Sequence, residues 1–230
     1  MSGASTPGRG DAGRSAHLLS ARSGGPPRAL SSPVLSPVII NAVKLHADEL
    51  ASALISDTDA VGMPVHGSRD AAVLIPIRDW TGRPEILFTE RPDHLEKHAG
   101  EISFPGGKIE SSDPSPRHTA LRESHEEVGI DPAEVEILGA LPPVGTFVTS
   151  FRIQPFVGLL SDEARPVPNP DEVAAILTIG IEELTKGYAM RRLVRRGVPI
   201  RTPTFEVERH LIWGATARIL TDLLRRIGAL

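Results

Sequence analysis

The sequence feature that most constrains the fold is a glycine pair, Gly106 and Gly107, followed by acidic residues at helical spacing. Two adjacent glycines allow the backbone to turn sharply and to approach a ligand closely. Glu123, Glu126 and Glu127 then occupy positions i, i+3 and i+4 of a predicted helix. Carboxylates on one helical face repel one another by about 0.2–0.5 kcal/mol per pair. Mg²⁺ would reverse the sign of that interaction, because it binds carboxylate oxygens together with water and substrate phosphates.

The segment resembles the Nudix box, the signature of the Nudix hydrolase family. The residues that match the family pattern are Arg122, Glu123, Glu126, Glu127, Gly129 and Ile130. Ser124 occupies a position that is aliphatic in the family. Asp113 stands where the pattern has a glutamate, and eight residues rather than seven separate it from Arg122, so its role stays open. The resemblance implies cleavage of a nucleoside diphosphate linked to another group, with Mg²⁺ or Mn²⁺ as the cofactor.

Residues 87–107 resemble an additional motif of the coenzyme A pyrophosphatase branch of that family. The matching positions are Leu87, Thr89, Arg91, Gly100, Phe104, Pro105, Gly106 and Gly107. His98 stands where a histidine is common in this branch, whereas Pro92 and Glu96 replace a serine and an arginine. The resemblance to this branch covers about residues 70–225, which is most of the chain.

The resemblance also implies roles for individual side chains. Substrate contacts are implied for Arg91, His98, Gly106 and Gly107, metal ligation for Glu123, Glu126 and Glu127, and catalysis for Arg122, Glu123, Glu127 and Glu172. Arg122 is expected to orient a glutamate, and Arg91 to grip a phosphate through its planar guanidinium. Glu172 lies outside the box, just before a predicted strand, and is a candidate base or additional metal ligand. Its alternative role is a charge at a strand edge.

The resulting prediction is a pyrophosphohydrolase whose partner is a small nucleotide derivative. Coenzyme A would give 3′,5′-ADP and 4′-phosphopantetheine. One alternative is the same chemistry on ADP-ribose, NADH, a dinucleoside polyphosphate or a nucleoside triphosphate. The other is a Nudix-fold nucleotide-binding module without turnover, against which the complete set of three box glutamates argues.

Length and composition limit the number of domains and the kinds of partner that the chain can have. The chain has 230 residues, enough for one good-sized core, which we place in a single domain over residues 37–230. Residues 1–36 are rich in Ser, Gly, Pro and Arg with one acid, Asp11, so a disordered tail is expected, with an organellar transit peptide as the alternative. A net charge of −4 and the lack of a long apolar run predict neither nucleic acid nor membrane as a partner. The absence of cysteine fits a cytoplasmic location, and a homodimer is one option for assembly.

Periodicity predicts the elements around the box. Helices are expected over residues 41–56, over the box itself and over residues 213–227, and strands over 71–77, 85–89, 135–141, 151–159 and 173–179. Pro114 or Pro116 suits the first turn of the box helix, with Asp113 or Ser115 as its cap and Gly129 at its end. This order of elements predicts an α/β fold, a Nudix-like α/β/α sandwich with a mixed sheet.

Two further groups of residues have alternative readings. His94 and His98, four residues apart, could share a metal, but no third ligand is evident nearby. Four arginines could meet an anion such as a 3′-phosphate, although a solvated basic loop is the simpler expectation; they are Arg191, Arg192, Arg195 and Arg196.

Overall fold

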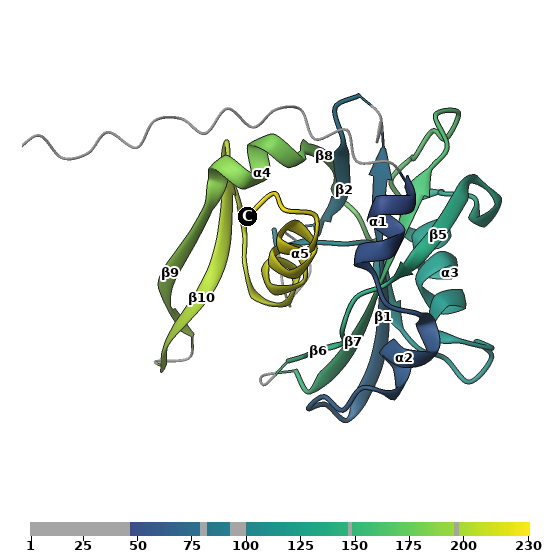
Figure 1. The fold of residues 1–230 in the computed structure, drawn as a ribbon, viewed down its shortest axis with the longest axis horizontal. Coiled ribbons are helices and arrows are strands. Elements are labelled where there is room, and N and C mark those ends of the chain that lie inside the picture. Colours follow the sequence, from purple (N-terminus) through teal and green to yellow (C-terminus); the bar gives the residue numbers. More distant parts are fainter. Residues whose placement is uncertain (1–46, 79–81, 93–99, 147–148, 196–197) are drawn as a thin grey trace, which may run out of the picture. The chain divides into compact units, whose positions relative to one another are not determined.

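The computed structural model describes residues 47–78, 82–92, 100–146, 149–195 and 198–230 (Figure 1). These residues all fall within one compact unit, Asn41–Leu230. The expected tail over residues 1–36 lies outside the described residues. So do His94 and His98. Among the described residues, no helix is both long enough and apolar enough to cross a bilayer.

In the part of the chain that the structure describes, the core is a mixed sheet of eight strands. Five strands lie side by side, in the order β3 (Ile102–Ser103), β2 (Glu85–Glu90), β1 (Arg69–Arg78), β7 (Phe151–Leu160) and β5 (Val135–Ala140). Three more join this path: β4 (Gly106–Lys108) on β1, β6 (Val144–Gly145) on β7, and β8 (Ala175–Gly180) on β2. β1 and β7 are parallel, and the other pairs are antiparallel.

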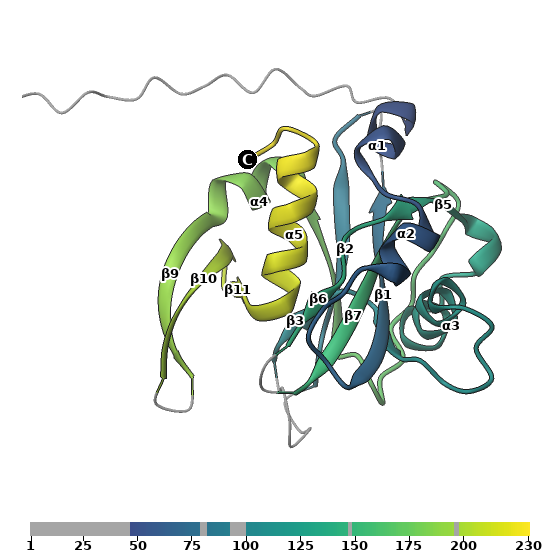
Figure 2. The ribbon, with the colours of Figure 1, turned by 60° about the horizontal axis from the view of Figure 1, so that its bottom comes forward.

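Helices cover both faces of this sheet, because successive side chains of a strand point to opposite faces. In β1, Leu74 is buried with Ala120 of helix α3 (Pro116–Val128). Ile77 points to the opposite face and is buried with residues of helix α5 (Gly214–Arg226). Figure 2 shows α3 and α5 on opposite sides of the sheet. The expected α/β/α sandwich with a mixed sheet is therefore confirmed.

Most of the predicted elements are present within a residue or two of their expected bounds. The strands predicted over 71–77, 85–89, 135–141 and 151–159 correspond to β1, β2, β5 and β7. β8 begins at Ala175 rather than at Val173, because the Val173 N–H instead donates to the Asn169 carbonyl in a turn. The C-terminal helix begins at Gly214, after Trp213.

The helix predicted over residues 41–56 is wrong in its C-terminal part. The structure has two short helices there, α1 (Ala47–Ala53) and α2 (Asp57–Gly62). Between them Ile55 exchanges two backbone hydrogen bonds with Ala140 of the sheet, at 3.0 and 2.9 Å. Ser56 then starts α2 by accepting a hydrogen bond from the Asp59 N–H, which is a favoured role for serine.

A second, three-stranded sheet follows the short helix α4 (Ile181–Gly187). Its strands are β9 (Tyr188–Arg195), β10 (Val198–Val207) and β11 (His210–Ile212), in the order β11-β10-β9. The expectation of a basic loop is therefore wrong for three of the four arginines, which lie in β9, and the fourth, Arg196, lies outside the described residues; the three are Arg191, Arg192 and Arg195. Arginines interrupt the apolar pattern of this strand, which is why the sequence did not indicate it.

Candidate active site

Helix α3 carries the box residues, and its two ends are fixed by its own sequence. The Ser115 hydroxyl accepts a hydrogen bond from the His118 N–H at 3.2 Å, and Pro116 occupies the first helical position. Gly129 ends the helix in the left-handed conformation, at φ 66°. Of the alternatives offered by the sequence, Ser115 is the cap and Asp113 is not.

The glycine pair runs directly beside this helix. Gly106 has φ 149° and donates its N–H to the Glu127 carboxylate, with N to Oε2 at 3.0 Å. A Cβ atom on Gly107 would collide with the carboxylate of Glu123. Both glycines therefore lie against the box glutamates, and a Cβ atom on Gly106 would also collide with the backbone carbonyl of Ala72 in β1.

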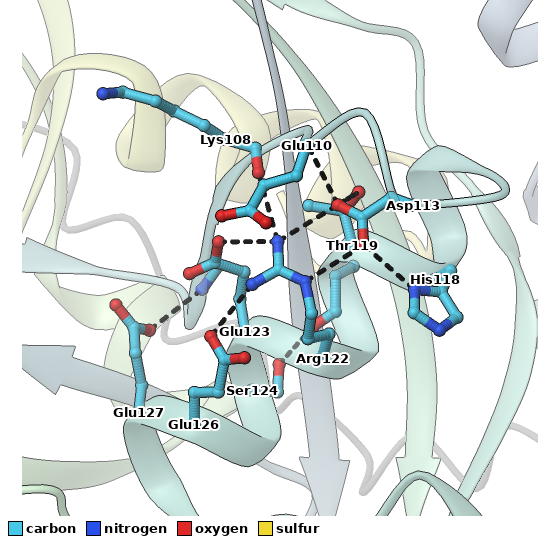
Figure 3. A network of polar contacts seen from close by, with 12 residues as sticks. Lys108, Glu110, Asp113, His118, Thr119, Arg122, Glu123, Ser124, Glu126 and Glu127 are labelled. Atoms are coloured by element: carbon cyan, nitrogen blue, oxygen red, sulfur yellow. Dashed lines mark hydrogen bonds and ion pairs between the residues drawn. The ribbon is translucent and has the colours of Figure 1, made fainter.

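Arg122 is the centre of the polar network in Figure 3. Its Nη2 donates to Glu123 Oε1 at 2.9 Å, and its Nη1 donates to Glu126 Oε2 at 2.9 Å. The same Nη2 also lies 3.3 Å from the backbone carbonyl oxygen of Lys108, in β4. Arg122 thus fixes two of the three box glutamates and joins them to the strand that carries the glycine pair.

Asp113 accepts two hydrogen bonds from Arg122. Its side chain is 1 % exposed and accepts from Arg122 Nε at 3.0 Å and from Arg122 Nη2 at 3.1 Å. It also accepts from the Thr119 hydroxyl at 2.8 Å and from the Glu110 N–H at 3.0 Å. The Arg122 guanidinium, followed by these two donors, holds the pKa of Asp113 well below its usual range against the effect of burial. The sequence left the role of Asp113 open, and in the structure its side chain fixes the position of Arg122.

Two of the glutamates, Glu123 and Glu127, have raised pKa values. Burial raises the pKa of Glu127 to about 7, and the charges of Glu123 and Glu172 add to that shift. The Gly106 N–H and the charge of Arg91 act in the opposite direction. Burial also raises the pKa of Glu123, with Glu126 and Glu172 contributing repulsion. These carboxylates are close enough to disfavour one another's charged forms.

Glu172 reaches this group from a distant part of the chain. The Asn169 N–H donates to the backbone carbonyl of Glu127 at 2.8 Å, and the Glu172 N–H donates to the Asn169 carbonyl at 3.1 Å. The turn before β8 is thereby fastened to the end of α3. The sequence did not point to Asn169, whose signal is only a polar turn residue ahead of Pro170.

Arg91, which is half-buried, adds a positive charge beside the carboxylates. Its Nε atom is buried and has no hydrogen-bond partner in the part of the chain that the structure describes. A buried, unpaired donor is costly unless a ligand satisfies it. The backbone of Arg91 is held by Glu101 and Gly100, through hydrogen bonds of 3.1 Å each.

Comparison with known proteins identifies the arrangement. The family model described as NUDIX domain matches residues 68–196, more than half of the chain. The chain belongs to the Nudix family. An "Uncharacterized Nudix hydrolase NudL" of Citrobacter koseri is 41 % identical over 162 residues, covering 70 % of this chain and 83 % of the relative. A protein of the same name from Pectobacterium atrosepticum is 40 % identical over 168 residues, covering 72 % and 86 %.

Solved structures are more distant. A crystal structure of a C. elegans Ap4A hydrolase binary complex covers 50 % of this chain and 83 % of its own, with 18 % identity and a TM-score of 0.43. A Nudix hydrolase of M. smegmatis, RenU, covers 58 % and 81 %, with 18 % identity and a TM-score of 0.43. The family assignment makes this chain a Nudix hydrolase, an enzyme that acts on pyrophosphate bonds and binds nucleotide-derivative substrates.

The donor set of this Nudix hydrolase suits the divalent metals that the family generally uses. Within the described ranges, no three acidic or histidine side chains already converge as a ready-made metal cage. Arg122 engages one oxygen each of Glu123 and Glu126, and the Gly106 N–H engages one of Glu127. The group is nevertheless all oxygen, crowded and mutually repulsive, and these are the properties that a hard divalent cation relieves.

A cavity adjoins Arg91 in this Nudix hydrolase. It has a volume of about 440 Å³ and is lined by Glu90, Gly100, Glu101, Ile102, Arg209, His210, Leu211 and Trp213. Glu101 and Gly100, which bind the Arg91 backbone, belong to its wall. A second cavity of about 460 Å³ lies at α1, α2 and β5, beside Asp57 and Arg117, and contains none of the predicted site residues.

The predicted site residues are thus brought together in large part. Glu123, Glu127, Arg122, Gly106 and Gly107 form one connected network. Two residues from other segments change the pKa of Glu127: the charge of Glu172 raises it, and the charge of Arg91 lowers it. Glu126 is the outlying member, because its side chain is 51 % exposed and is held by Arg122. Sequence reasoning missed Thr119 and the Lys108 carbonyl, which complete the surroundings of Asp113 and Arg122.

Proposed function

We propose that this Nudix hydrolase cleaves the pyrophosphate of coenzyme A or its derivatives, giving 3′,5′-ADP and 4′-phosphopantetheine. The observation that carries the proposal is the buried, unpaired Nε of Arg91 beside the carboxylates. Arg91 belongs to the segment 87–107 that resembles the coenzyme A branch. A guanidinium in this place is suited to a doubly charged phosphate of a bound pyrophosphate.

Mg²⁺ or Mn²⁺ would be held by Glu123, Glu127 and Glu126, with Glu172 as a further ligand or as the base. The ion would neutralise charge on the pyrophosphate and would lower the pKa of a water so that it can lose a proton near neutral pH. Arg122 keeps Glu123 and Glu126 in place, and Gly106 keeps Glu127 in place through its N–H. Such fixed positioning is the main contribution that a protein makes to phosphoryl transfer.

The protein's own residues also account for the movement of protons. A water molecule adds to one phosphorus, the bond from that phosphorus to the bridging oxygen breaks, and the leaving phosphate keeps the bond's electrons. We assign Glu172 as the acceptor of the water's proton, because its charge already acts on both Glu123 and Glu127.

The remainder of the substrate would occupy the cavity of about 440 Å³ that adjoins Arg91. This volume falls in the range of small-molecule sites. Trp213 offers a flat apolar surface there, and Glu90, Arg209 and His210 offer polar groups to a pantetheine or nucleoside portion.

A substrate panel tests the proposal. Coenzyme A, acyl-coenzyme A, ADP-ribose, NADH and diadenosine tetraphosphate would be compared at equal concentration with Mg²⁺, with products identified by mass spectrometry in isotopically labelled water. We expect coenzyme A or its acyl derivative to have the highest kcat/KM. If ADP-ribose or NADH exceeds it clearly, the coenzyme A assignment is wrong and the family assignment stands.

Cellular context is a further part of the proposal. We place the protein in the cytoplasm because it has no cysteine, and we take residues 37–230 as one domain with a homodimer as one option for its assembly. Fractionation, limited proteolysis and light scattering of the full chain test these three statements separately.

A further inference from the structure

The β9–β10 hairpin extends away from the rest of the protein. Figures 1 and 2 both show the two strands running outward past α5. At its base the rings of Tyr188 and Phe205 pack with centroids 5.4 Å apart, and Phe205 is fully buried in the core beside α5. We call residues 190–194 and 199–203, which lie beyond this base, the arm.

The arm is strongly basic in an otherwise acidic protein. Between Tyr188 and Phe205 the sequence contains five arginines and no Lys, Asp or Glu, although the whole chain has a net charge of −4. Arg191 is paired with Glu206. Arg192 and Arg201 lie directly opposite each other across the two strands, and both are exposed. Like charges in this position destabilise a hairpin, unless an anionic partner opposes them.

Apolar side chains follow the arginine pair on both faces of the arm. The next cross-strand pair, Leu193 with Ile200, points to one face, and the pair after it, Val194 with Pro199, points to the other. Val194 is 74 % exposed, and Ile200 is also exposed. A partner protein would cover one face and leave the other in water. A lipid surface can surround both.

We propose that the arm binds the surface of a bilayer that contains anionic lipids. Arg192 and Arg201 would contact lipid phosphates, to which a guanidinium binds strongly. Leu193, Val194 and Ile200 would enter the boundary between headgroups and acyl chains. This is peripheral attachment by a hairpin, and it needs no spanning segment. The net charge of the whole chain does not reveal the positive charge of the arm, because the acidic residues lie elsewhere in the chain.

Other occupants fit less well. Two copies related by a two-fold axis through this face would bring Arg192 and Arg201 against themselves, with no carboxylate on the face to oppose them. Single-stranded nucleic acid prefers aromatic side chains on which bases stack. Residues 189–204 contain no aromatic residue.

Vesicle flotation with the full-length protein tests the proposal. Vesicles of phosphatidylcholine alone would be compared with vesicles that also contain phosphatidylglycerol, at low and high salt. We expect binding only to the anionic vesicles, and weakening by salt. The double variant Arg192→Gln/Arg201→Gln should lower the partition coefficient about 25-fold, since each arginine near an anionic surface contributes a factor of about 5.

Two matched variants separate charge from packing. Arg152→Gln/Arg165→Gln removes the same charge from exposed positions outside the arm and should bind as the wild type does. Val194→Ser/Ile200→Ser keeps every arginine and should still weaken binding, because the apolar contribution is lost.

The proposal is overturned if the arm variants float as the wild type does, as they would if the arginine-containing residues 1–36 alone attracted the vesicles. It is also overturned if Arg192→Gln/Arg201→Gln converts a dimer to a monomer, or raises KM for coenzyme A, while vesicle binding is unchanged. The first result would assign the arm to self-association, and the second would assign it to the substrate. Flotation with anionic vesicles and its weakening by salt are both independent of which substrate the enzyme hydrolyses.

Discussion

Asp113 and Arg122 are joined by two hydrogen bonds, from Nε to Oδ1 at 3.0 Å and from Nη2 to Oδ2 at 3.1 Å. A buried carboxylate therefore sets the position of the guanidinium that holds Glu123 and Glu126. A shorter acid placed one residue further upstream still reaches the arginine. Asp113 lies in the loop before α3, which begins at Pro116.

Asp113→Asn should lower both kcat and the melting temperature. The asparagine keeps the size of the side chain but replaces an acceptor oxygen with a donor that faces Arg122. The folded-state pKa of Asp113 is depressed, so its stabilising contribution is present above the unfolded value of 3.8 and is lost as the pH falls below it. Denaturation of variant and wild type at several pH values should show a difference that shrinks below about pH 4. Asp162→Asn, at an exposed position, should show no such difference.

Glu127→Gln should cut kcat by roughly 10²-fold or more, as the loss of one charge-stabilising group typically does. Without metal the same variant should be more stable than the wild type near neutral pH. The folded-state pKa of Glu127 is raised from 4.5 to about 7, so the wild type loses stability as the pH rises through this window, by at most about 1.4 kcal/mol per pH unit.

Urea denaturation in EDTA across this window tests the sign of the effect. The wild-type curve should fall with pH, and the Glu127→Gln curve should be flatter. Glu136→Gln, at an exposed position of β5, is the matched control. A Glu127→Gln enzyme that is folded and has near wild-type kcat would place the chemistry elsewhere.

Removal of metal should abolish turnover, and addition of Mg²⁺ or Mn²⁺ should restore it. The same ions should raise the melting temperature, because a ligand that binds only the folded state stabilises it and here also offsets carboxylate repulsion. Product formation and thermal melting, each measured with EDTA and after readdition of metal, provide two independent readouts. Undiminished turnover after exhaustive chelation would rule out the mechanism.

Arg91→Ala should raise KM for coenzyme A by about 10- to 100-fold, the effect of losing a charge-assisted hydrogen bond, and should change kcat less. Steady-state kinetics with coenzyme A measures this split. Arg91→Lys should recover part of the loss, since it restores the charge without the planar fork. Arg165→Ala removes an exposed arginine that donates to backbone carbonyls and should leave KM unchanged. Equal effects of the two alanine variants would exclude a substrate contact for Arg91.

Deletion of residues 1–36 should leave hydrolysis and the melting temperature nearly unchanged, because this segment lacks apolar residues at a packing period. Kinetics and calorimetry of the shortened chain would test this. A large fall in either quantity would show that the segment packs on the enzyme.

Helices and strands whose bounds depend on neighbouring residues could be predicted from the sequence. Those whose bounds depend on contacts with distant parts of the chain could not. The end of α3 at Gly129 could be predicted, and its start could be narrowed to Asp113 or Ser115, because caps depend on neighbouring residues alone. The division at Ile55 could not, since it depends on a bridge to Ala140, far along the chain. The three-stranded sheet was missed because arginines interrupt the period of its strands.

The candidate site divides in the same way. The grouping of the three box glutamates follows from helical spacing. That Glu172 lies close enough to Glu123 and Glu127 to raise the pKa of each depends on the Asn169 turn, which no local pattern indicates. The burial of the Arg91 Nε atom likewise depends on the packing of a complete sheet.

The parallel pairing of β1 with β7 has a consequence for biosynthesis. The two strands form the longest ladder within the eight-stranded sheet, yet the residues they bring together are 82 positions apart in the chain. A nascent chain that has just extruded the glutamate helix still lacks the strand against which β1 aligns. Closure of so long a loop is slow compared with local structure formation. The glycine pair, Arg122 and the box glutamates therefore leave the ribosome before β7, and Glu172 leaves after it, so that the pyrophosphatase centre can assemble only once β7 has been synthesised.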